Sequence, residues 1–370
     1  METKRKLVTI RKISSIIEIK DCTEIALGVV DGWTVIIKKS EFSIGDSCVF
    51  FEIDSFLPLE PRYEFLKKTT KFDGKEGYRI KTMKMKGVLS QGLALPLTMF
   101  PEVSTNDDDV TNRLSIIKFD LEQFYGANTA GPRERKFGSF PTFIPKTDQP
   151  RIQNMTHMFL THKATTFEET LKLDGSSMTC YKIPNKPTLF QRVLSFFGKQ
   201  LPIYKFGVCS RNVDLKPSDN KVQVFDNFGK KSVYAQSDFW ATAIKMDIED
   251  KLPIGYAIQG ELIGPSIQAN HEKVSSLDYF VFDVYDINKK QYLTPEARRE
   301  FCKQHNIQHV PVTNPNATPL QMTLEELLAH VDTESMNQGT VSEGRVYKSN
   351  SYPTMSFKVI NNKYLLKHEK

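Results

Sequence analysis

The N-terminal part of the chain consists of short apolar runs separated by turn residues. The runs are LVTIRKI, WTVIIKK, SCVFFEI, GYRIKTMKM and GLALPL, and Asp31-Gly32, Gly45-Asp46 and Asp73-Gly74 lie between them. Apolar runs of this length, bounded by Gly, Asp and Pro, are typical of β-strands rather than helices. Roughly five or six short strands without a convincing helix predict a small β-barrel of the OB kind, or a sandwich.

A polar, acidic stretch, PEVSTNDDDVTN at residues 101–112, ends this pattern. Such a composition is the best linker candidate in the chain. We therefore predict two domains, an OB-like nucleic-acid-binding domain over residues 1–110 and a larger domain over residues 111–370.

Strand-like and helical patterns mix in the larger domain. Thr294-Pro295-Glu296 predicts the start of a helix, because Thr is a good N-cap and Pro is favoured at the first helical position. Thr323 and Glu326 have the spacing of a capping box, which predicts a second helix. The larger domain is therefore predicted to be α+β.

Positive charge is unevenly spread along the chain. The formal net charge is only +6 over 370 residues, but between Arg62 and Lys86 nine basic residues stand against three acidic ones. A local positive excess suits a polyanion such as a nucleic-acid backbone. A solvated basic face without a ligand explains the segment equally well.

The cysteines and the N-terminus bear on the compartment. The five cysteines are scattered and include no CxxC pair, which favours a reducing compartment over a disulfide framework or a zinc site. The start, METKRKLVTI, lacks the apolar core of a signal peptide, and no stretch approaches the length of a membrane span. We predict an intracellular, cytoplasmic protein without a membrane partner, and a nuclear location stays open.

The stretch TLKLDGSSMTCYKI, residues 170–183, contains the first candidate for chemistry. Its alternation predicts a strand, yet Lys172 and Asp174 share one face and Gly175 interrupts the run. A strand-borne lysine acts as a nucleophile if its amine is kept neutral, by desolvation or by nearby positive charge. Asp174 beside it suits a metal's water shell or a ribose hydroxyl. A surface strand that ends in a Gly-Ser turn is the alternative.

Further motifs follow in a fixed order. They are Ser210-Arg211-Asn212, QGELIGP at 259–265, FVFDVY at 280–285, EGRV at 343–346 and SFKV at 356–359. Together with the K-x-D-G element at residues 172–175, these motifs resemble those of the covalent nucleotidyltransferases, which comprise RNA ligases, DNA ligases and mRNA capping enzymes. QGELIGP and FVFDVYD resemble the RNA ligase branch most, and IDSFLP and RIKTMKMKGVLSQGLALP resemble the N-terminal OB domain of one subgroup.

The resemblance implies a fold, a cofactor set and a set of site residues. It implies a nucleotidyltransferase domain of antiparallel sheets flanked by helices, which binds ATP with Mg²⁺ or Mn²⁺. Lys172 would attack the α-phosphorus to form lysyl-AMP, Lys358 would neutralise the α-phosphate, and the metal would be held through water by Asp174, Glu261 and Glu343. The implied nucleotide-binding residues are Arg151, Leu171, Gly175, Arg211, Asn212 and either Phe280 or Phe282 as the base platform.

One position departs from the family pattern. RNA ligases of this type often carry a second lysine two positions before the last one, and this chain has Ser356 there. Either Lys348 or Lys363 supplies the missing charge, or one phosphate contact is absent.

The resemblance also implies a substrate. AMP would pass to the 5′-phosphate of an RNA, and a 3′-hydroxyl would then displace the AMP and seal the strand. The implied substrate is a nicked duplex, the implied role is RNA repair, and the implied enzyme is a monomer. The RNA-binding residues would be Lys67, Lys68, Arg79, Lys81, Lys84 and Lys86. The alternatives are a DNA ligase or a GTP-using mRNA guanylyltransferase and, in another class, an inactive nick- or RNA-binding protein.

Overall fold

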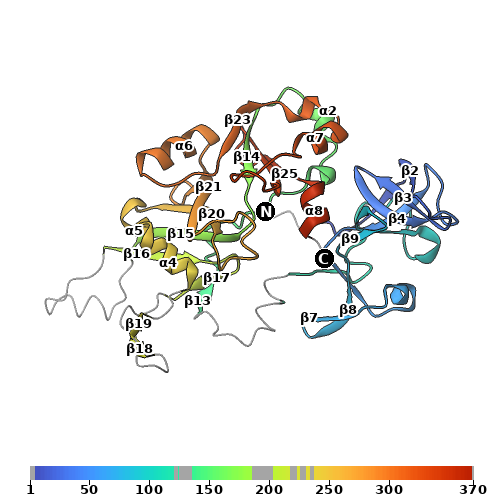
Figure 1. Ribbon diagram of the computed structural model, residues 1–370, viewed down its shortest axis with the longest axis horizontal. Coiled ribbons are helices and arrows are strands. Elements are labelled where there is room, and N and C mark those ends of the chain that lie inside the picture. The colour runs from blue at the N-terminus through green and yellow to red at the C-terminus, as the bar shows by residue number, and fades with distance from the viewer. Residues whose placement is uncertain are drawn as a thin grey trace.

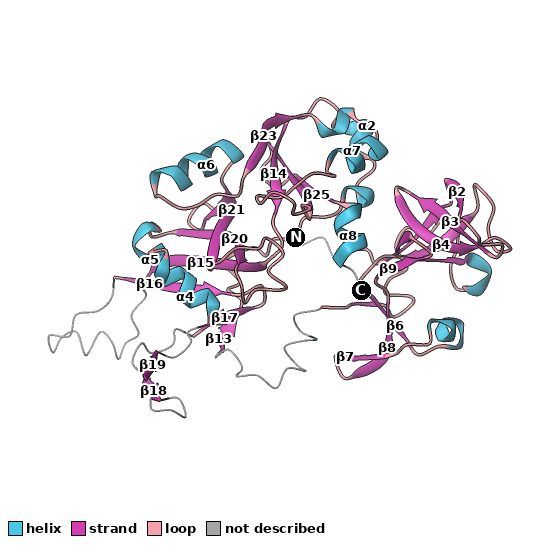
Figure 2. Ribbon diagram, in the orientation of Figure 1, coloured by secondary structure: helices cyan, strands magenta, loops and turns pink. Residues whose placement is uncertain are grey.

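The chain forms two parts that lie side by side. A computed structural model describes residues 5–120, 124, 136–185, 203–216, 223–225, 231–233 and 237–368. Figure 1 shows the N-terminal part in blue beside a larger part that runs from green to red. Strands dominate the N-terminal part, and most of the helices belong to the larger part (Figure 2). None of the helices in the described residues is long and apolar enough to cross a membrane.

The N-terminal part is built from short antiparallel strands. Its sheets have the orders β2-β3-β4, β1-β5-β11, β10-β9 and β12-β6-β8-β7. The elements are β1 (Val8–Lys12), β2 (Ser15–Glu18), β3 (Ile25–Val30), β4 (Trp33–Lys38), β5 (Ser47–Phe51), β6 (Ser55–Pro58), η1 (Pro61–Leu66), β7 (Thr70–Phe72), β8 (Lys75–Arg79), β9 (Thr82–Met85), β10 (Val88–Gln91), β11 (Leu93–Pro96), η2 (Leu97–Met99) and β12 (Ile117–Lys118).

These strands meet the prediction of an OB-like β domain, although backbone pairing among the described strands does not close them into a ring. Side-chain hydrogen bonds join β4 to β10 instead. The Thr34 hydroxyl donates to the backbone oxygen of Leu89 at 2.8 Å, and the Ile36 N–H donates to the Ser90 hydroxyl oxygen at 3.0 Å. Hydrogen bonds of this kind satisfy strand-edge groups that a closed barrel would pair through its backbone.

The apolar core of the N-terminal part continues past the expected linker. Val110, Leu114 and Ile116 pack in one buried cluster with Phe51, and β12 pairs with β6 beyond them. The division at residue 110 remains a prediction, because packing alone does not define a domain boundary.

The larger part contains two principal antiparallel sheets. A seven-stranded sheet has the order β13-β17-β16-β15-β20-β21-β22, and a four-stranded sheet has the order β23-β14-β24-β25. The strands are β13 (Lys136–Ser139), β14 (Phe167–Lys172), β15 (Ser176–Pro184), β16 (Tyr204–Cys209), β17 (Val213–Leu215), β18 (Gln223–Phe225), β19 (Lys231–Val233), β20 (Tyr256–Ile263), β21 (Asp278–Asp286), β22 (Gln291–Tyr292), β23 (Val312–Ala317), β24 (Gly344–Ser349) and β25 (Ser356–Ile360).

Helices flank these sheets, as predicted. The helices are η3 (Ile152–Asn154), α2 (Met158–Thr161), α4 (Asp238–Lys245), α5 (Ile248–Lys251), α6 (Pro295–Gln304), η4 (Pro319–Gln321), α7 (Leu324–His330) and α8 (Asn362–His368). The two predicted helix starts are confirmed, because Thr294 caps α6 and a full capping box precedes α7.

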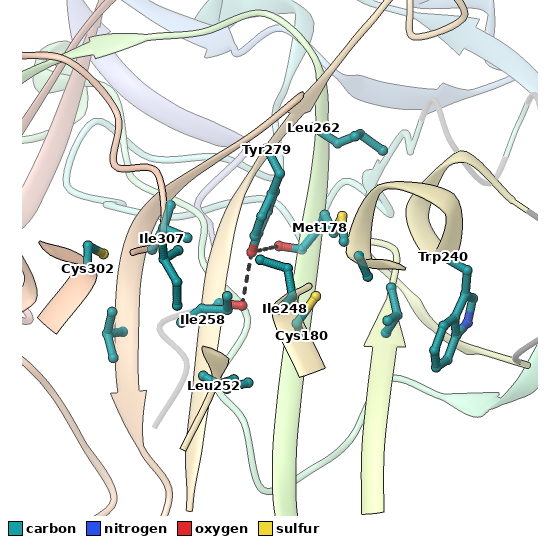
Figure 3. Packing of buried hydrophobic residues seen from close by; sticks show 14 of the residues in the cluster. Met178, Cys180, Trp240, Ile248, Leu252, Ile258, Leu262, Tyr279, Cys302 and Ile307 are labelled. Carbon is teal, nitrogen blue, oxygen red and sulfur yellow. Dashed lines mark hydrogen bonds between the residues drawn. The ribbon is translucent and has the colours of Figure 1, made fainter. Parts of the chain in front are cut away.

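The largest apolar cluster lies between the seven-stranded sheet and α4, α5 and α6. It joins Met178 and Ile258 of the sheet to Trp240 of α4 and Ile248 of α5. Figure 3 shows the buried Tyr279 hydroxyl aimed at the backbone oxygens of Met178 and Ile258, each 3.1 Å away. This hydrogen bonding lets a tyrosine sit fully buried.

The interrupted strand of the sequence is two strands in two sheets. β14 ends at Lys172 and belongs to the four-stranded sheet, whereas β15 begins at Ser176 and belongs to the seven-stranded sheet. Leu173, Asp174 and Gly175 make the crossing. The K-x-D-G element therefore lies where the two sheets meet.

The two parts of the molecule touch near this region. The Arg11 guanidinium of β1 donates to the Asn154 side chain at 3.1 Å. The Arg151 guanidinium lies 5.2 Å from the centroid of the Trp33 ring. The N-terminal part is therefore held against the start of the larger part by polar and cation–π contacts.

Candidate active site

Lys172 and Glu343 meet at the ends of two paired strands. Lys172 is the last residue of β14 and pairs with Gly344, the first residue of β24, which places the preceding Glu343 beside it. The Lys172 ammonium nitrogen lies 2.5 Å from Glu343 Oε2, and the lysine side chain is 23% exposed. The predicted nucleophile is thus accessible and already carries a carboxylate partner.

Glu261 and Gly175 bring the seven-stranded sheet to the same place. Glu261 is in β20, opposite Ser177 of β15. A Cβ on Gly175 would lie 2.3 Å from the Leu262 backbone oxygen and 3.1 Å from Glu261 Cγ. Only glycine lets the crossing loop approach β20 this closely.

The carboxylates dominate the local electrostatics. Burial lowers the pKa of the Lys172 amine, but Glu343, Glu261 and Asp174 outweigh it, and the net pKa lies above its ordinary value. Burial raises the pKa of Glu261, the charges of Glu343 and Asp174 add to this shift and Lys172 opposes it, and the resulting pKa is about 8. In the ligand-free protein these acidic side chains therefore favour the ammonium form of Lys172, and a neutral amine at the moment of attack stays a prediction.

The same excess of negative charge fits a divalent cation. Among the described residues, no group of three Asp, Glu, His or Cys side chains is arranged to bind a metal ion directly. Mg²⁺ dehydrates reluctantly and keeps several water ligands, so carboxylates that accept hydrogen bonds from its waters suit it. Asp174, Glu261 and Glu343 fit such a water-mediated site.

A cationic pocket lies beside these carboxylates. Asp148 forms ion pairs with Lys118 at 3.0 Å, Lys358 at 3.4 Å and Arg211 at 3.8 Å. Burial opposes ionisation of Asp148, but the three cations hold its pKa well below the usual range. A cavity of about 190 Å³ opens here, lined by Lys118, Asp120, Phe140, Lys146, Thr147, Asp148, Ser177, Thr179, Arg211, Asn212 and Gln259.

Lys358 and Arg151 enter this region on adjacent segments. The Lys358 N–H donates to the Pro150 backbone oxygen at 2.8 Å, and Arg151 forms a parallel bridge with Lys358. Burial lowers the pKa of Lys358 to about 8; Asp148 opposes this shift, whereas Lys172 and Arg151 reinforce it. A cation surrounded by other cations favours an incoming anion, so this is a suitable phosphate site.

Leu171, the residue before Lys172, lies in an apolar area with Phe280 and Phe282. All three belong to one cluster, in which Leu171 is buried and the two phenylalanines are partly buried. Tyr279 and Val281, which alternate with them along β21, point into the main core. Both phenylalanines therefore lie on the face of β21 that packs in the Leu171 cluster, and the choice of base platform between them stays open.

The two lysines that could replace the charge missing at Ser356 both form ion pairs with other residues. Lys348 is buried against Asp283 at 2.5 Å, and Lys363 pairs with Asp332 at 2.5 Å. Ser356 itself is the first residue of β25 and pairs with Lys348. Sequence reasoning missed Lys118 and Asp148, which supply charge to the pocket from positions that no motif marks.

The predicted RNA-binding residues are spread over two places on the N-terminal part. Lys67 and Lys68 follow η1, whereas Lys84 and Lys86 are exposed on the β9–β10 hairpin. Arg79 is tied to Asp54 at 3.2 Å and stacks on Phe119, and Lys81 lies just before the hairpin.

Known proteins resemble both parts of the chain. A model of an OB-fold domain matches residues 7–97, and a model of the RNA ligase family matches residues 165–360. A search of curated protein sequences found no match.

Solved structures of Naegleria gruberi RNA ligase align with the whole chain at 38% identity. A lysine-to-methionine variant with AMP and Mn covers 99% of both chains with a TM-score of 0.79. The ligase with PPi covers 99% of both chains with a TM-score of 0.78. A glutamate-to-alanine variant with ATP and Mn covers 99% of this chain and 100% of its own, with a TM-score of 0.77.

Proposed function

The chain belongs to the RNA ligase family, and on that premise we propose that it activates RNA ends through a covalent lysyl-AMP intermediate on Lys172. The observation that carries the proposal is the position of Lys172, between three carboxylates and a cationic pocket at the junction of two sheets. ATP and a divalent metal are the cofactors, as in the Naegleria structures that hold ATP or AMP with Mn.

In the first step, the Lys172 nitrogen attacks the α-phosphorus of ATP. A nitrogen–phosphorus bond forms, the bond to the bridging oxygen of pyrophosphate breaks, and the attacking amine loses one proton to water. Lys358 neutralises negative charge on the α-phosphate, and Arg211 and Lys118 hold the leaving pyrophosphate in the cationic pocket. Positioning and charge neutralisation of this kind dominate catalysis of phosphoryl transfer.

The three carboxylates would bind the metal before Lys172 attacks the α-phosphorus. Asp174, Glu261 and Glu343 would hold a hydrated Mg²⁺ or Mn²⁺, whose charge offsets theirs and polarises the phosphate. Glu343 would then no longer stabilise the ammonium form of Lys172. The excess of negative charge in the ligand-free site supports an order in which the metal cation binds first and the Lys172 amine becomes neutral afterwards.

In the second and third steps AMP moves to RNA. The 5′-phosphate of an RNA attacks the lysyl-AMP phosphorus and frees Lys172, and a 3′-hydroxyl then attacks the activated end and releases AMP. We propose a nicked duplex as the substrate, bound by a monomer with an N-terminal domain over residues 1–110 and a catalytic domain over residues 111–370. The cytoplasmic location stays a prediction, with five free cysteines as its support.

Mass spectrometry of the intact protein after exposure to ATP and Mn²⁺ tests the first step. We expect one added AMP, located on Lys172 by peptide mapping and absent from the Lys172→Ala variant. The exposed lysine variant Lys289→Ala should form the adduct as the wild type does. Labelling by GTP instead would favour a guanylyltransferase, and no adduct with intact RNA binding would favour an inactive binding protein.

Salt dependence tests the RNA surface. Replacing both Lys84 and Lys86 with Ala should reduce the slope of log affinity against log salt by about 0.7 to 0.9 for each phosphate that the protein no longer neutralises. The matched double variant Lys12→Ala/Lys20→Ala, also exposed, should leave the slope unchanged. Equal slopes in both variants would exclude the β9–β10 hairpin as the docking surface, and sealing of nicked DNA in preference to RNA would favour a DNA ligase.

A further inference from the structure

The C-terminal helix α8 stands between the two parts of the molecule. Figure 1 shows it in red, close to β9 of the N-terminal part. Leu365 of α8 is buried in one cluster with Ile360 of β25 and Leu89 of β10. The Gln91 side chain donates to Asn362 at 3.4 Å. The N-terminal part therefore helps to fix where α8 lies.

The neighbouring residue of α8 reaches the candidate active site. The Tyr364 hydroxyl donates to Asp174 Oδ2 at 2.8 Å. The Tyr364 ring packs edge-on against the His271 ring at 4.9 Å, and His271 Nε2 lies 2.7 Å from the Val341 backbone oxygen. Ring contacts of this kind restrict the tyrosine, so that its hydroxyl stays aimed at one oxygen.

Asp174 depends on such contacts because it lies in the crossing loop between β14 and β15, outside any strand. Its backbone faces the carboxylate of Glu272, a residue that is 1% exposed. Tyr364 thus fixes the side chain of Asp174, whose backbone lies beside a buried carboxylate. Oδ1 is then the oxygen left to accept a hydrogen bond from a metal-bound water.

We propose that Tyr364 is a positioning residue that orients the Asp174 carboxylate toward the divalent metal of the adenylylation step. The inference rests on the proposed function. It assigns an active-site role to the C-terminal helix, and it makes the N-terminal part a support of the catalytic centre through α8.

The Tyr364→Phe variant tests this role, because it removes the hydroxyl and keeps the ring. The Mn²⁺ concentration for half-maximal lysyl-AMP formation should rise about three- to tenfold, which is within the range expected for the loss of one ordinary hydrogen bond. The rate at saturating Mn²⁺ should approach that of the wild type. A merely structural defect would lower the active fraction equally at every Mn²⁺ concentration.

Direct Mn²⁺ binding gives a readout that needs no turnover. Free Mn²⁺, measured by electron paramagnetic resonance in titrations of the full chain with AMP, should show the same weakening in Tyr364→Phe. The Tyr352→Phe variant, whose ring is 58% exposed, should match the wild type in both assays. In an Asp174→Asn background the added Tyr364→Phe change should have less than about a twofold effect, since the two residues act as one unit.

The outcomes separate the two proposals. Wild-type Mn²⁺ dependence and binding in Tyr364→Phe would overturn the positioning role alone. Full additivity with Asp174→Asn would also overturn it, because Tyr364 would then act elsewhere. Absence of lysyl-AMP in the wild type would overturn the proposed function, and the positioning role with it.

Discussion

Removal of the Glu343 charge should free the Lys172 amine in the absence of metal. Glu343 Oε2 lies 2.5 Å from the Lys172 nitrogen, and Glu343→Gln keeps the shape of the side chain while it removes the charge. A carboxylate this close shifts the pKa of a partner by about one to three units. Glu261 and Asp174 stay near the amine, so we expect a fall in the Lys172 pKa of about one unit, the low end of that range.

The sign of the effect on reactivity follows from the pKa. At a pH below the pKa of the amine, a fall of about one unit raises the neutral fraction about tenfold. Fluorodinitrobenzene reacts only with the neutral amine, and peptide mapping by mass spectrometry measures its reaction at Lys172 alone. Lys172 should therefore be labelled about tenfold faster in Glu343→Gln than in the wild type, without metal or nucleotide. The exposed Glu300→Gln variant of α6 is the matched control.

Adenylylation should move in the opposite direction. With ATP and Mn²⁺, Glu343→Gln should form lysyl-AMP at least about tenfold more slowly, because the site has one fewer acceptor for the metal's waters. Unchanged or slower labelling of Lys172 in Glu343→Gln would refute the view that this carboxylate stabilises the protonated form of the resting nucleophile. Faster adenylylation would refute its metal-holding role.

Two other perturbations separate the chemistry from the scaffold. Gly175→Ala should slow lysyl-AMP formation at least about tenfold, because its Cβ would meet β20. The control Gly138→Ala, with open space around it, should leave the rate unchanged, and equal rates in the two variants would contradict the close approach of the crossing loop to β20. Lys348→Met should lower the free energy of unfolding by urea by about 3–5 kcal/mol, because it leaves Asp283 buried without its closest partner. Lys289→Met, at an exposed pair, should lower it by less than about 1 kcal/mol, and a similar decrease in both variants would contradict the reasoning.

The sequence pointed to residues that the structure brings together, but not to how they are arranged. Lys172, Glu261 and Glu343 stand in short motifs whose residue types already indicate phosphoryl transfer. The alternation around Lys172 predicted one strand, because periodicity cannot show that a chain leaves one sheet for another. Gly175 marked the place, but the partner that makes it necessary, the backbone of β20, lies far along the chain.

Long-range partners were the part that sequence reasoning could not reach. Asp148 lies three residues before Arg151 and has no motif of its own, yet it gathers three cations from distant segments. Tyr364 lies beyond the last motif, in a short helix that no strong apolar period indicates. Their roles depend on contacts across more than 60 residues of chain, which local patterns do not encode.

The position of the site between two sheets requires that the sheets keep a fixed relation, and a buried charge network provides one. Lys348 of β24 pairs with Asp283 of β21, and Arg298 of α6 bonds to Glu168 of β14 and lies 3.6 Å from Asp283. Burial and the Arg298 charge lower the pKa of His309 to about 3, so that this histidine is neutral and accepts from Arg298 Nε at 3.0 Å. Each charge in the network is left without its partner if one sheet slides on the other. Because an unpaired buried charge is far more costly than a small defect in apolar packing, we expect the network to restrict the sheets to one register and so to hold the halves of the site together.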